Sequence, residues 1–349
     1  MSDDTARAMN PAGTKSPVVD FHAHVLHPAV YAKTISRNVI SGFGLHKMEE
    51  RPTPDSPRWP LFSKMVLPDV QLADMDARGI DHAVIATSTV SQSTFFADAG
   101  LAAELDRQAN EGIADWVRMH PARFTGTCTL PLQDMQRALT ELDYATGTLG
   151  LRIVNLPAAI DGKYLGDVYF EPLWETIARL GLVAIIHPDG IKDPAFQAYS
   201  LWNAIGQGIE ETRAMASLIY EGTLERHPDL KIVMAHAGGY LPTYIARLDR
   251  NATAHPVSMR NISRKPSAYL RNFYYDTVTY DPFVINIVRE RIGADRILFG
   301  SDYPFGDDDP LAMINACGFD PATYAAVISG TATALIAGTT TRSLGGMSK

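Results

Sequence analysis

The sequence predicts an α/β fold, namely a (β/α)8 barrel with a cap inserted after its first strand. Eight short apolar runs, most of them followed by a helical pattern, recur along the 349 residues. Histidine or aspartate stands at the end of several of these runs. The carboxyl ends of barrel strands converge on one face, where the active site is built, so this placement favours a barrel over a doubly wound open sheet.

The eight predicted strands alternate with helices along most of the chain. The strands are expected over residues 18–22, 82–88, 124–130, 149–154, 182–187, 231–236, 274–278 and 296–300. Helices are expected over 69–78, 100–120, 132–146, 170–180 and 209–226. Asp69 is the expected start signal of the first helix, and Gly79 its end signal. Two nearly pure apolar runs, 182–187 and 231–236, are typical of strands buried on both faces of a parallel sheet.

The chain is expected to form one barrel over residues 17–340, between a disordered leader (1–16) and a tail (341–349). Residues 27–68 show no clear hydrophobic period, and a loop this long usually has a function, so we expect a cap over the end of the first strand. This segment carries three arginines that are candidates for binding an anionic substrate, each with a solvated surface position as its alternative: Arg37, Arg51 and Arg58.

The composition, with 46% hydrophobic and 20% charged residues, is that of an ordinary globular enzyme. The net charge of −8, without a basic stripe, argues against a nucleic-acid partner. The two cysteines, Cys128 and Cys317, are expected to be buried thiols in a reducing compartment. No apolar run is expected to reach the roughly 18 residues that span a bilayer, and the first 16 residues lack a signal-peptide core. A cytoplasmic protein without a membrane partner is the resulting prediction.

Five ionisable residues stand at the ends of four predicted strands. His22 and His24 share one side of the first strand because side chains alternate with a period of two. His187 closes the fifth strand, His236 closes the sixth, and Asp302 follows the eighth. Three histidines and one carboxylate suit zinc, with a position left for water whose pKa the metal would lower. The remaining imidazole would serve as general acid or base.

Spacing leaves open which histidine is the remaining one. His236 lies in Ala-His-Ala-Gly-Gly, whose small neighbours let a substrate approach closely, and this favours it as the acid or base. The reverse assignment, with His236 as a ligand and His187 as the base, fits the same spacing. A hydrogen-bonded core position is the simpler explanation of any single histidine, but not of histidines at three strand ends.

Four motifs follow one another along the chain. They are Asp-Phe-His-Ala-His at 20–24, Ile-Ile-His-Pro at 185–188, Met-Ala-His-Ala-Gly-Gly-Tyr-Leu-Pro at 234–242 and Leu-Phe-Gly-Ser-Asp-Tyr-Pro-Phe at 298–305. In this order and spacing they resemble the amidohydrolase superfamily, and more narrowly its amidohydrolase-2 branch, which contains metal-dependent decarboxylases. The resemblance runs from about Val18 to Ala337.

The resemblance implies one divalent metal ion, zinc or another such as manganese, held by His22, His24, His187 and Asp302. It also implies that His236 is the catalytic base that activates water on this metal, with Asp302 in the catalytic group as well. It further implies a homodimer, because Arg247, eleven residues after His236, would reach the neighbouring subunit's site and bind a substrate carboxylate. Arg58 is the nearest counterpart of a second substrate-binding arginine in the cap.

Two positions depart from particular members of the branch. Asp189 follows His187-Pro188 where one of the decarboxylases carries an aromatic residue, so an aromatic platform for that enzyme's substrate is missing. Decarboxylases of aromatic acids generally begin with Glu-x-His, whereas this chain has His22.

The sequence therefore predicts a zinc-dependent nonoxidative decarboxylase of an unsaturated or aromatic carboxylic acid. A hydrolase of an amide, a lactone or a carbon–carbon bond would use the same residues, and a barrel that keeps its metal only as a structural feature is a third possibility. No dinucleotide fingerprint follows a strand, so no redox cofactor is expected. The expected partners are a small-molecule carboxylate and a second copy of the chain.

Overall fold

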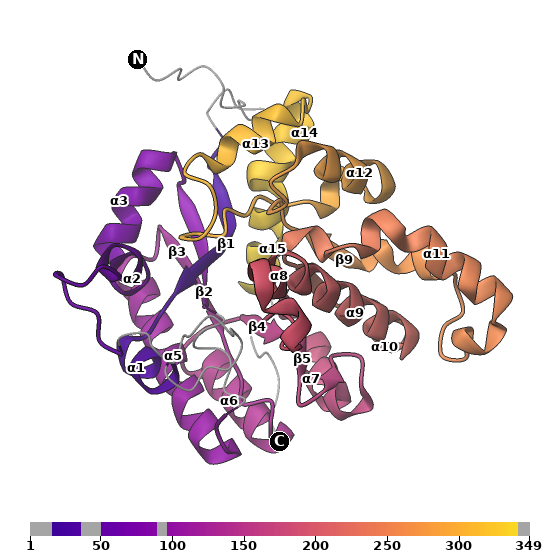
Figure 1. Cartoon of the computed structure of the whole chain (residues 1–349), viewed down its shortest axis with the longest axis horizontal. Helices are drawn as coiled ribbons and strands as arrows, with labels where there is room; N and C mark the ends of the chain where they lie inside the picture. The colour runs from indigo at the N-terminus through magenta and orange to yellow at the C-terminus, as the bar shows by residue number, and fades with distance from the viewer. Residues whose placement is uncertain (1–15, 36–49, 89–95, 341–349) are drawn as a thin grey trace.

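Seven parallel strands form one curled sheet, with helices packed around it (Figure 1). The computed structural model describes residues 16–35, 50–88 and 96–340. The sheet order is β1 (Val19–Val25), β2 (His82–Thr87), β3 (Phe124–Cys128), β4 (Ile153–Pro157), β7 (Val183–His187), β8 (Lys231–Met234) and β9 (Phe273–Tyr275). A separate antiparallel hairpin, β5 (Ala159–Ile160) with β6 (Lys163–Tyr164), follows β4. The predicted α/β class is confirmed.

The segment 297–303 occupies the position of the predicted eighth strand, between β9 and β1. It is not a regular strand, but Leu298 N donates to Tyr275 O at 3.0 Å, and Phe21 N donates to Phe299 O at 2.8 Å. His24 N also donates to the carbonyl of residue 303 at 2.8 Å. These hydrogen bonds join the two edges of the sheet into a barrel-like closure. Near the end of this segment, residue 302 has a left-handed φ of 56°, which does not fit an extended ladder.

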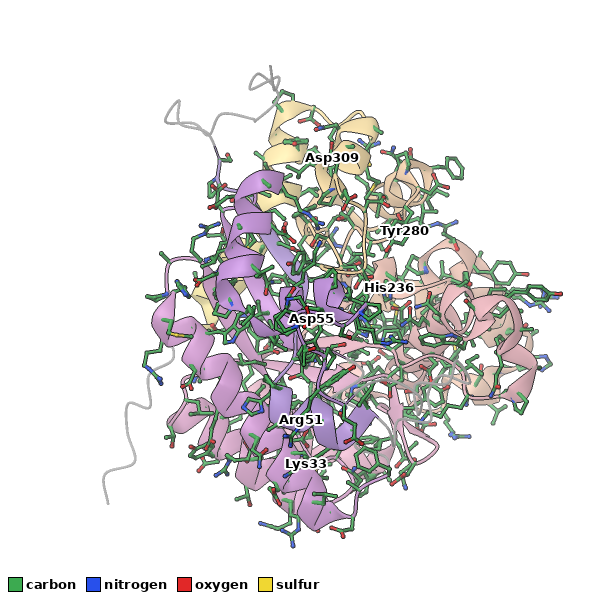
Figure 2. All side chains as sticks on the ribbon, turned by 60° about the vertical axis from the view of Figure 1, so that its left-hand side comes forward. Lys33, Arg51, Asp55, His236, Tyr280 and Asp309 are labelled. Carbon is green, nitrogen blue, oxygen red and sulfur yellow. The ribbon has the colours of Figure 1, made fainter. Side chains whose placement is uncertain are left out.

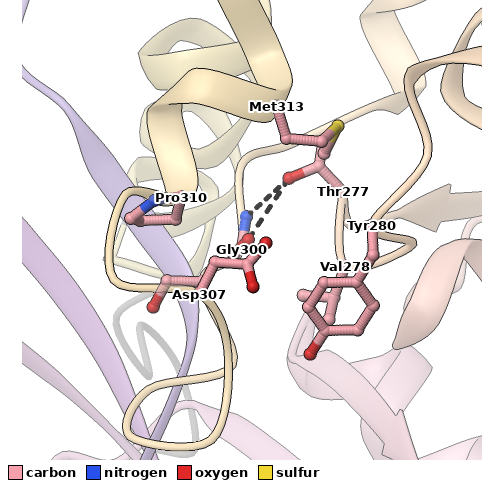
Figure 3. A pocket seen from close by; sticks show the side chains of 8 residues that line it. Thr277, Val278, Tyr280, Gly300, Asp307, Pro310 and Met313 are labelled. Carbon is pink, nitrogen blue, oxygen red and sulfur yellow. Dashed lines mark hydrogen bonds between the residues drawn. The ribbon is translucent and has the colours of Figure 1, made fainter.

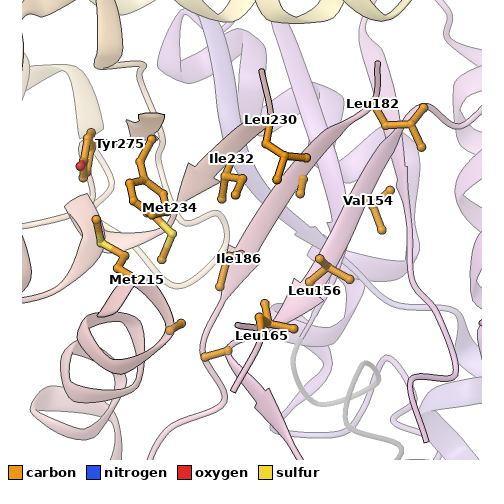
Figure 4. Close-up of a cluster of buried hydrophobic side chains, with 14 of the residues drawn as sticks. Val154, Leu156, Leu165, Leu182, Ile186, Met215, Leu230, Ile232, Met234 and Tyr275 are labelled. Carbon is orange, nitrogen blue, oxygen red and sulfur yellow. The ribbon is translucent and has the colours of Figure 1, made fainter. Parts of the chain in front are cut away.

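The two faces of the sheet contribute to two different apolar cores. On the outer face, strand side chains pack against helices such as α7 (Glu171–Leu180). This set of side chains includes Val154, Leu156, Ile186, Ile232 and Met234 (Figure 4). Because side chains alternate along a strand, the other set lies on the inner face. It comprises Val19, Phe21, Val84, Ile153, Val183, Ile185, Val233 and Leu298. Ala332 and Leu335 of α15 (Thr331–Thr340) join this inner set, so α15 closes one end of the interior.

All five predicted helices are present, with boundaries that differ by a few residues. The longer helices are α3 (Pro68–Arg78), α5 (Ala99–Met119), α6 (Met135–Gly147), α7, α9 (Gly206–Tyr220), α11 (Leu241–Ala254) and α12 (Pro282–Ile292). Asp69 is not the N-cap of α3, because Leu67 holds that position and Pro68 begins the helix. Gly79 ends α3 at a φ of 69°, as predicted. The helix expected over 209–226 is divided at Gly222, whose φ is 75°, into α9 and α10 (Thr223–Arg226).

Residues 27–68 are more regular than the sequence suggested. Helix α1 (Pro28–Thr34) and helix α2 (Trp59–Val66) lie at the two ends of this segment. They pack together through Tyr31, Ile35, Phe62 and Met65. Helices of seven and eight residues are too short to show a clear hydrophobic period in the sequence. Arg37 and most of the predicted leader and the whole tail lie outside the described residues.

One helical run has the length and composition of a membrane span, contrary to the expectation from the sequence. It covers Pro321–Thr339, through α14 (Pro321–Ala325), a π-helical turn (Ala326–Gly330) and α15. Val327 and Ile328 are fully buried in the helix-covered core, and Leu335 lies in the inner one. Packing against the sheet therefore accounts for the apolar composition of this run.

Candidate metal centre and active site

A β-bulge in β1 turns the two histidines of this strand toward the interior. The β1–β2 register shifts between Asp20 and Ala23. Phe21 belongs to the inner core and Ala23 to the helix-covered core, so His22 and His24 point inward although His22 directly follows Phe21. Strict alternation from Phe21 would have turned both imidazoles toward the helices. The bulge thus creates the first half of the site.

Four of the predicted residues bring one potential ligand atom each to within 4.8 Å of the others: His22, His24, His187 and Asp302. His24 Nε2 lies 3.1 Å from Asp302 Oδ1 and 3.1 Å from His22 Nε2. All three histidines are buried. Imidazole nitrogens and a carboxylate oxygen at this spacing fit one divalent cation, which would also relieve the close approach of two ring nitrogens.

The surroundings of three of these four side chains, His24, His187 and Asp302, favour the protonation state that binds a metal. Burial, followed by the charges of the neighbouring histidines, lowers the pKa of His187 well below its usual value. Burial also lowers the pKa of His24. Burial alone would raise the pKa of Asp302, but the hydrogen bond from His24 and the adjacent histidine charges lower it to about 2. His24 and His187 therefore offer neutral imidazoles beside an ionised carboxylate. Burial alone would lower the pKa of His22 as well, but the hydrogen bond to Asp276 and the charge of Asp302 raise it.

Asp276 belongs to this site although the sequence analysis did not select it. Its Oδ2 lies 2.6 Å from His22 Nδ1, and its Oδ1 accepts hydrogen bonds from Ala237 N and Val278 N, both at 3.1 Å. Asp276 directly follows β9, so the rule that selected polar residues at strand ends applies to it. It was missed because the predicted strand, 274–278, ran through this position.

His236 lies beside the metal cluster in a strained turn after β8. Its ring centroid is 5.2 Å from that of His187 and 5.4 Å from that of His22. The φ angles of His236 and Ala237 are 45° and 53°, in the left-handed region that non-glycine residues rarely adopt. Such strain persists where the surroundings enforce it, and it is common at functional sites.

A second carboxylate that the sequence analysis missed holds His236. Glu211 of α9 is fully buried, and its Oε1 lies 2.6 Å from His236 Nδ1. Burial alone would lower the pKa of His236, but the charge and hydrogen bond of Glu211 outweigh it and raise this pKa. Burial raises the pKa of Glu211 as well. Since α9 is distant in the sequence from β8, no local pattern could have paired these two residues.

Gly300 lets the closing segment approach the metal cluster. A Cβ atom at this position would lie 2.9 Å from the Cβ of His22 and 3.2 Å from that of Asp276. Thr277 Oγ1 donates to Gly300 O at 3.3 Å and accepts from Gly300 N at 3.1 Å (Figure 3). A cavity of about 20 Å³ beside these atoms has room for about one water molecule. Only glycine fits here without displacing a proposed ligand.

A larger cavity, of about 480 Å³, opens beside His236 and Asp302. Its size is that of a small-molecule site. Tyr280 lies above His236 in Figure 2, and its hydroxyl donates to Asp302 Oδ2 at 3.5 Å. The rest of the lining is mostly small or polar and includes Asn203, Gln207, Glu211, Tyr240, Thr243 and Thr279. The described residues that line it include no lysine or arginine.

The two predicted substrate-binding arginines lie outside the lining of this cavity. Arg58 is exposed at the N-cap of α2, and Arg247 is exposed on α11. Neither guanidinium forms an ion pair with a described residue of the same chain. The structure thus brings together the five residues at the strand ends, but it does not bring either arginine to them.

The fold and the site define a metal-dependent enzyme of the barrel type. The sequence model of the amidohydrolase family matches residues 19–336, and the chain belongs to this family. As the motifs suggested, it is similar to 2-amino-3-carboxymuconate-6-semialdehyde decarboxylase from Dictyostelium discoideum, with 30% identity over 68% of this chain and 67% of that protein. The chain is therefore an enzyme, a metal-dependent carbon–carbon lyase or hydrolase of the amidohydrolase superfamily.

Two solved structures extend the similarity over almost the whole chain. The 5-carboxyvanillate decarboxylase from Sphingomonas paucimobilis has a TM-score of 0.83 and 26% identity, covering 92% of this chain and 99% of that one. The dihydroxybenzoic acid decarboxylase from Polaromonas sp. has a TM-score of 0.78 and 25% identity, covering 92% and 97%. The latter contains manganese and the inhibitor 2-nitroresorcinol.

Proposed function

We propose that this protein is a nonoxidative decarboxylase of an aromatic or unsaturated carboxylic acid and depends on one divalent metal ion. The observation that carries the proposal is the cluster of four potential ligand atoms within 4.8 Å of one another, beside a cavity of about 480 Å³. The relatives described above, which decarboxylate aminocarboxymuconate semialdehyde, carboxyvanillate and dihydroxybenzoate, support the same reaction class.

We assign the metal to His22, His24, His187 and Asp302. A cation at this point would act as a Lewis acid on a substrate oxygen and neutralise the charge of a carboxylate. Three nitrogen ligands and one oxygen ligand suit zinc, whereas the manganese in the Polaromonas enzyme supports that ion equally. Metal analysis of protein purified without added metal decides between the two.

We assign the proton transfer to His236. Decarboxylation breaks the bond between the carboxylate carbon and its neighbour, and the electron pair stays on the neighbouring carbon. That carbon must then receive a proton as carbon dioxide leaves. Glu211 holds Nδ1 of His236, so Nε2 is the ring atom available to deliver the proton. The raised pKa of His236 favours the imidazolium that this step needs, and solvent restores its proton afterwards.

We propose that the substrate's anionic group is bound by arginines from outside the cavity lining. Arg247 lies three residues after Tyr244 and seven after Tyr240, the N-cap of α11, so the three share one side of the helix, and Tyr240 also lines the cavity. An exposed guanidinium in this position is suited to reach the cavity of a second copy, which makes a homodimer part of the proposal. Arg58 of α2 would approach from the cap formed by residues 27–68. A cytoplasmic location remains a prediction.

One experiment tests the reaction class. Metal-loaded protein is incubated with a panel of carboxylated phenols and unsaturated acids, and with amides and lactones, in water enriched in oxygen-18. Release of carbon dioxide from a carboxylated compound, lost with a chelator and restored by metal, supports the decarboxylase. Incorporation of oxygen-18 into a product acid without carbon dioxide release identifies the hydrolase that the same residues would support.

A further inference from the structure

Asp276 contacts both halves of the candidate site at once. One carboxylate oxygen lies 2.6 Å from Nδ1 of His22, a proposed metal ligand. The other accepts a hydrogen bond from the amide of Ala237, directly after His236. Asp276 is 1% exposed, so solvent does not compete for these contacts.

We propose that Asp276 is a positioning residue that fixes the tautomer of His22 for metal binding and holds the turn that carries His236. The 2.6 Å contact between this carboxylate and Nδ1 of His22 places a ring proton on Nδ1. The lone pair of Nε2 then faces the cluster, where His24 Nε2 and Asp302 Oδ1 lie 3.1 Å and 3.3 Å away. The proposal rests on the metal site of the proposed function, but not on the decarboxylation.

The other two proposed histidine ligands lack such a partner. His187 Nδ1 donates to the carbonyl of Pro188 at 2.9 Å, so a neutral backbone group orients it. His24 Nδ1 has no hydrogen-bond partner among the described residues. Among the described residues, His22 is the one proposed histidine ligand whose Nδ1 contacts a carboxylate, and such a partner makes a ligand more basic as well as orienting it. Asp276 therefore has the largest expected influence on the affinity for the metal.

Asp276→Asn tests the effect on the tautomer of His22 while keeping a side chain of nearly the same size and shape. The variant's amide oxygen still accepts from Ala237 N and Val278 N, but its NH2 group faces Nδ1 of His22. The ring proton is then forced onto Nε2, where it points into the cluster, as occurs in the aspartate-to-asparagine variant of a serine protease triad. We expect metal binding about 10–100-fold weaker than in the wild type.

Asp20 of β1 provides a matched control. Asp20 is also 1% exposed, but it accepts from the backbone N of His22 and from Ser301, and it makes no described bond to an imidazole. Asp20→Asn therefore should not change the ring tautomer. Affinity is measured for Mn²⁺ and Zn²⁺ by competition with a chelating indicator, on variants whose metal-free unfolding midpoints have been compared.

Nitrogen-15 spectra of the histidine rings test the proposal without metal. At a pH where the ring is neutral, the His22 signal, assigned by comparison with His22→Gln, should show the proton on Nδ1 in the wild type. It should show the proton on Nε2 in Asp276→Asn. Amide signals of Ala237 and Val278 should move in Asp276→Ala, which loses the acceptor, and stay in place in Asp276→Asn.

The proposal is overturned by a wild-type His22 with its proton on Nε2, or by an equal loss of metal affinity in Asp20→Asn and Asp276→Asn. Protein whose metal affinity depends on Asp276 but that releases no carbon dioxide would refute the proposed function and leave this inference standing. Normal decarboxylation by the wild type, together with full metal affinity in Asp276→Asn, would refute this inference and leave the proposed function standing.

Discussion

The Oε1 atom of Glu211 lies 2.6 Å from Nδ1 of His236, so a buried carboxylate on α9 orients the imidazole that follows β8. This pairing determines which ring nitrogen faces the cavity and which protonation state the ring adopts. Its effect on the pKa of His236 is opposed by any cation bound beside the ring, since like charges disfavour the imidazolium. The balance of these two influences sets the pH range in which His236 donates a proton.

Replacing Glu211 with Gln should shift the pH dependence of turnover. The carboxylate raises the pKa of His236, so its loss lowers that pKa, and the imidazolium disappears at a lower pH. The alkaline limb of the kcat profile should therefore move to lower pH. Glu210→Gln is the matched control, because Glu210 lines a different cavity with Tyr164 and Arg213. An unmoved alkaline limb in Glu211→Gln would remove Glu211 from the proton-transfer step.

His236→Asn should separate proton transfer from metal binding. Loss of a general acid typically costs about 10²–10⁴-fold in turnover. Metal content measured by atomic emission should remain near that of the wild type, whereas His187→Ala should lose metal. A His236→Asn protein that purifies without metal, beside a metal-bound His187→Ala, would show that the two histidines have the reverse roles.

Gly300→Ala should weaken metal binding although the change is a single methyl group. The new Cβ would lie 2.9 Å from the Cβ of His22, so backbone or ligand must move, at a typical cost of about 1–3 kcal/mol. Gly147→Ala is the control, because nothing lies within 4 Å of a Cβ there. Equal metal affinity and equal denaturation midpoints in both variants would contradict the close approach seen in the structure.

Arg247→Ala should raise KM for a carboxylated substrate and leave metal content and folding unchanged. Arg250→Ala, another exposed arginine on α11, should behave like the wild type. If the Arg247 guanidinium acts in the site of the other subunit, a dimer of one Arg247→Ala and one His236→Asn protomer keeps one complete site. Mixing the two impaired variants should therefore restore part of the activity. Kinetics of Arg247→Ala that match those of the wild type would exclude this residue from substrate binding.

Asp106 of α5 should make the protein less stable as the pH rises. Burial, and then the charge of Glu141, raise its pKa well above the usual value. The folded state therefore holds this proton more tightly than the unfolded state, and the stabilisation present at acidic pH is lost as the pH rises through the folded pKa. Asp106→Asn, which cannot ionise, should be more stable than the wild type at pH 8, by about 1–3 kcal/mol in urea unfolding.

The exposed Asp115 on the same helix provides the control for that measurement, since its side chain is 54% exposed and forms a salt bridge with Arg118, which is also exposed. Asp115→Asn should change the unfolding free energy little at any pH. The unfolding free energy of the wild type is compared with that of Asp106→Asn at acidic pH and at pH 8. If the difference between the two proteins does not change with pH, Asp106 is not protonated in the folded protein.

The strand-end residues could be predicted because the fold itself brings the carboxyl ends of parallel strands together. A local pattern thus placed His22, His187 and Asp302 correctly in one cluster. The sequence analysis missed Asp276 because it placed the end of this strand three residues too late, whereas β9 stops at Tyr275. Glu211 could not be found in this way, because its contact with His236 depends on how α9 packs against the turn after β8.

The inward direction of His22 depends on a bulge, and no residue type in the motif signals a shift of register. The sequence indicated that two histidines share one side of a strand, but not which side. The irregular eighth segment was likewise predicted as an ordinary strand, because the apolar run before Gly300 resembles one. Backbone conformations such as the left-handed φ of Asp302 follow from tertiary contacts.

The way the sheet closes also determines when, during synthesis, the metal site can exist. His24 is made 278 residues before Asp302, its partner in the cluster. β1 can pair early with β2, but its other edge has no neighbour until residues 297–303 leave the ribosome. For most of translation the nascent chain therefore carries a histidine-bearing strand with an open edge, a feature that invites mispairing or a chaperone. The complete set of ligands can therefore capture a metal ion only after Asp302, 278 residues beyond His24, has been synthesised.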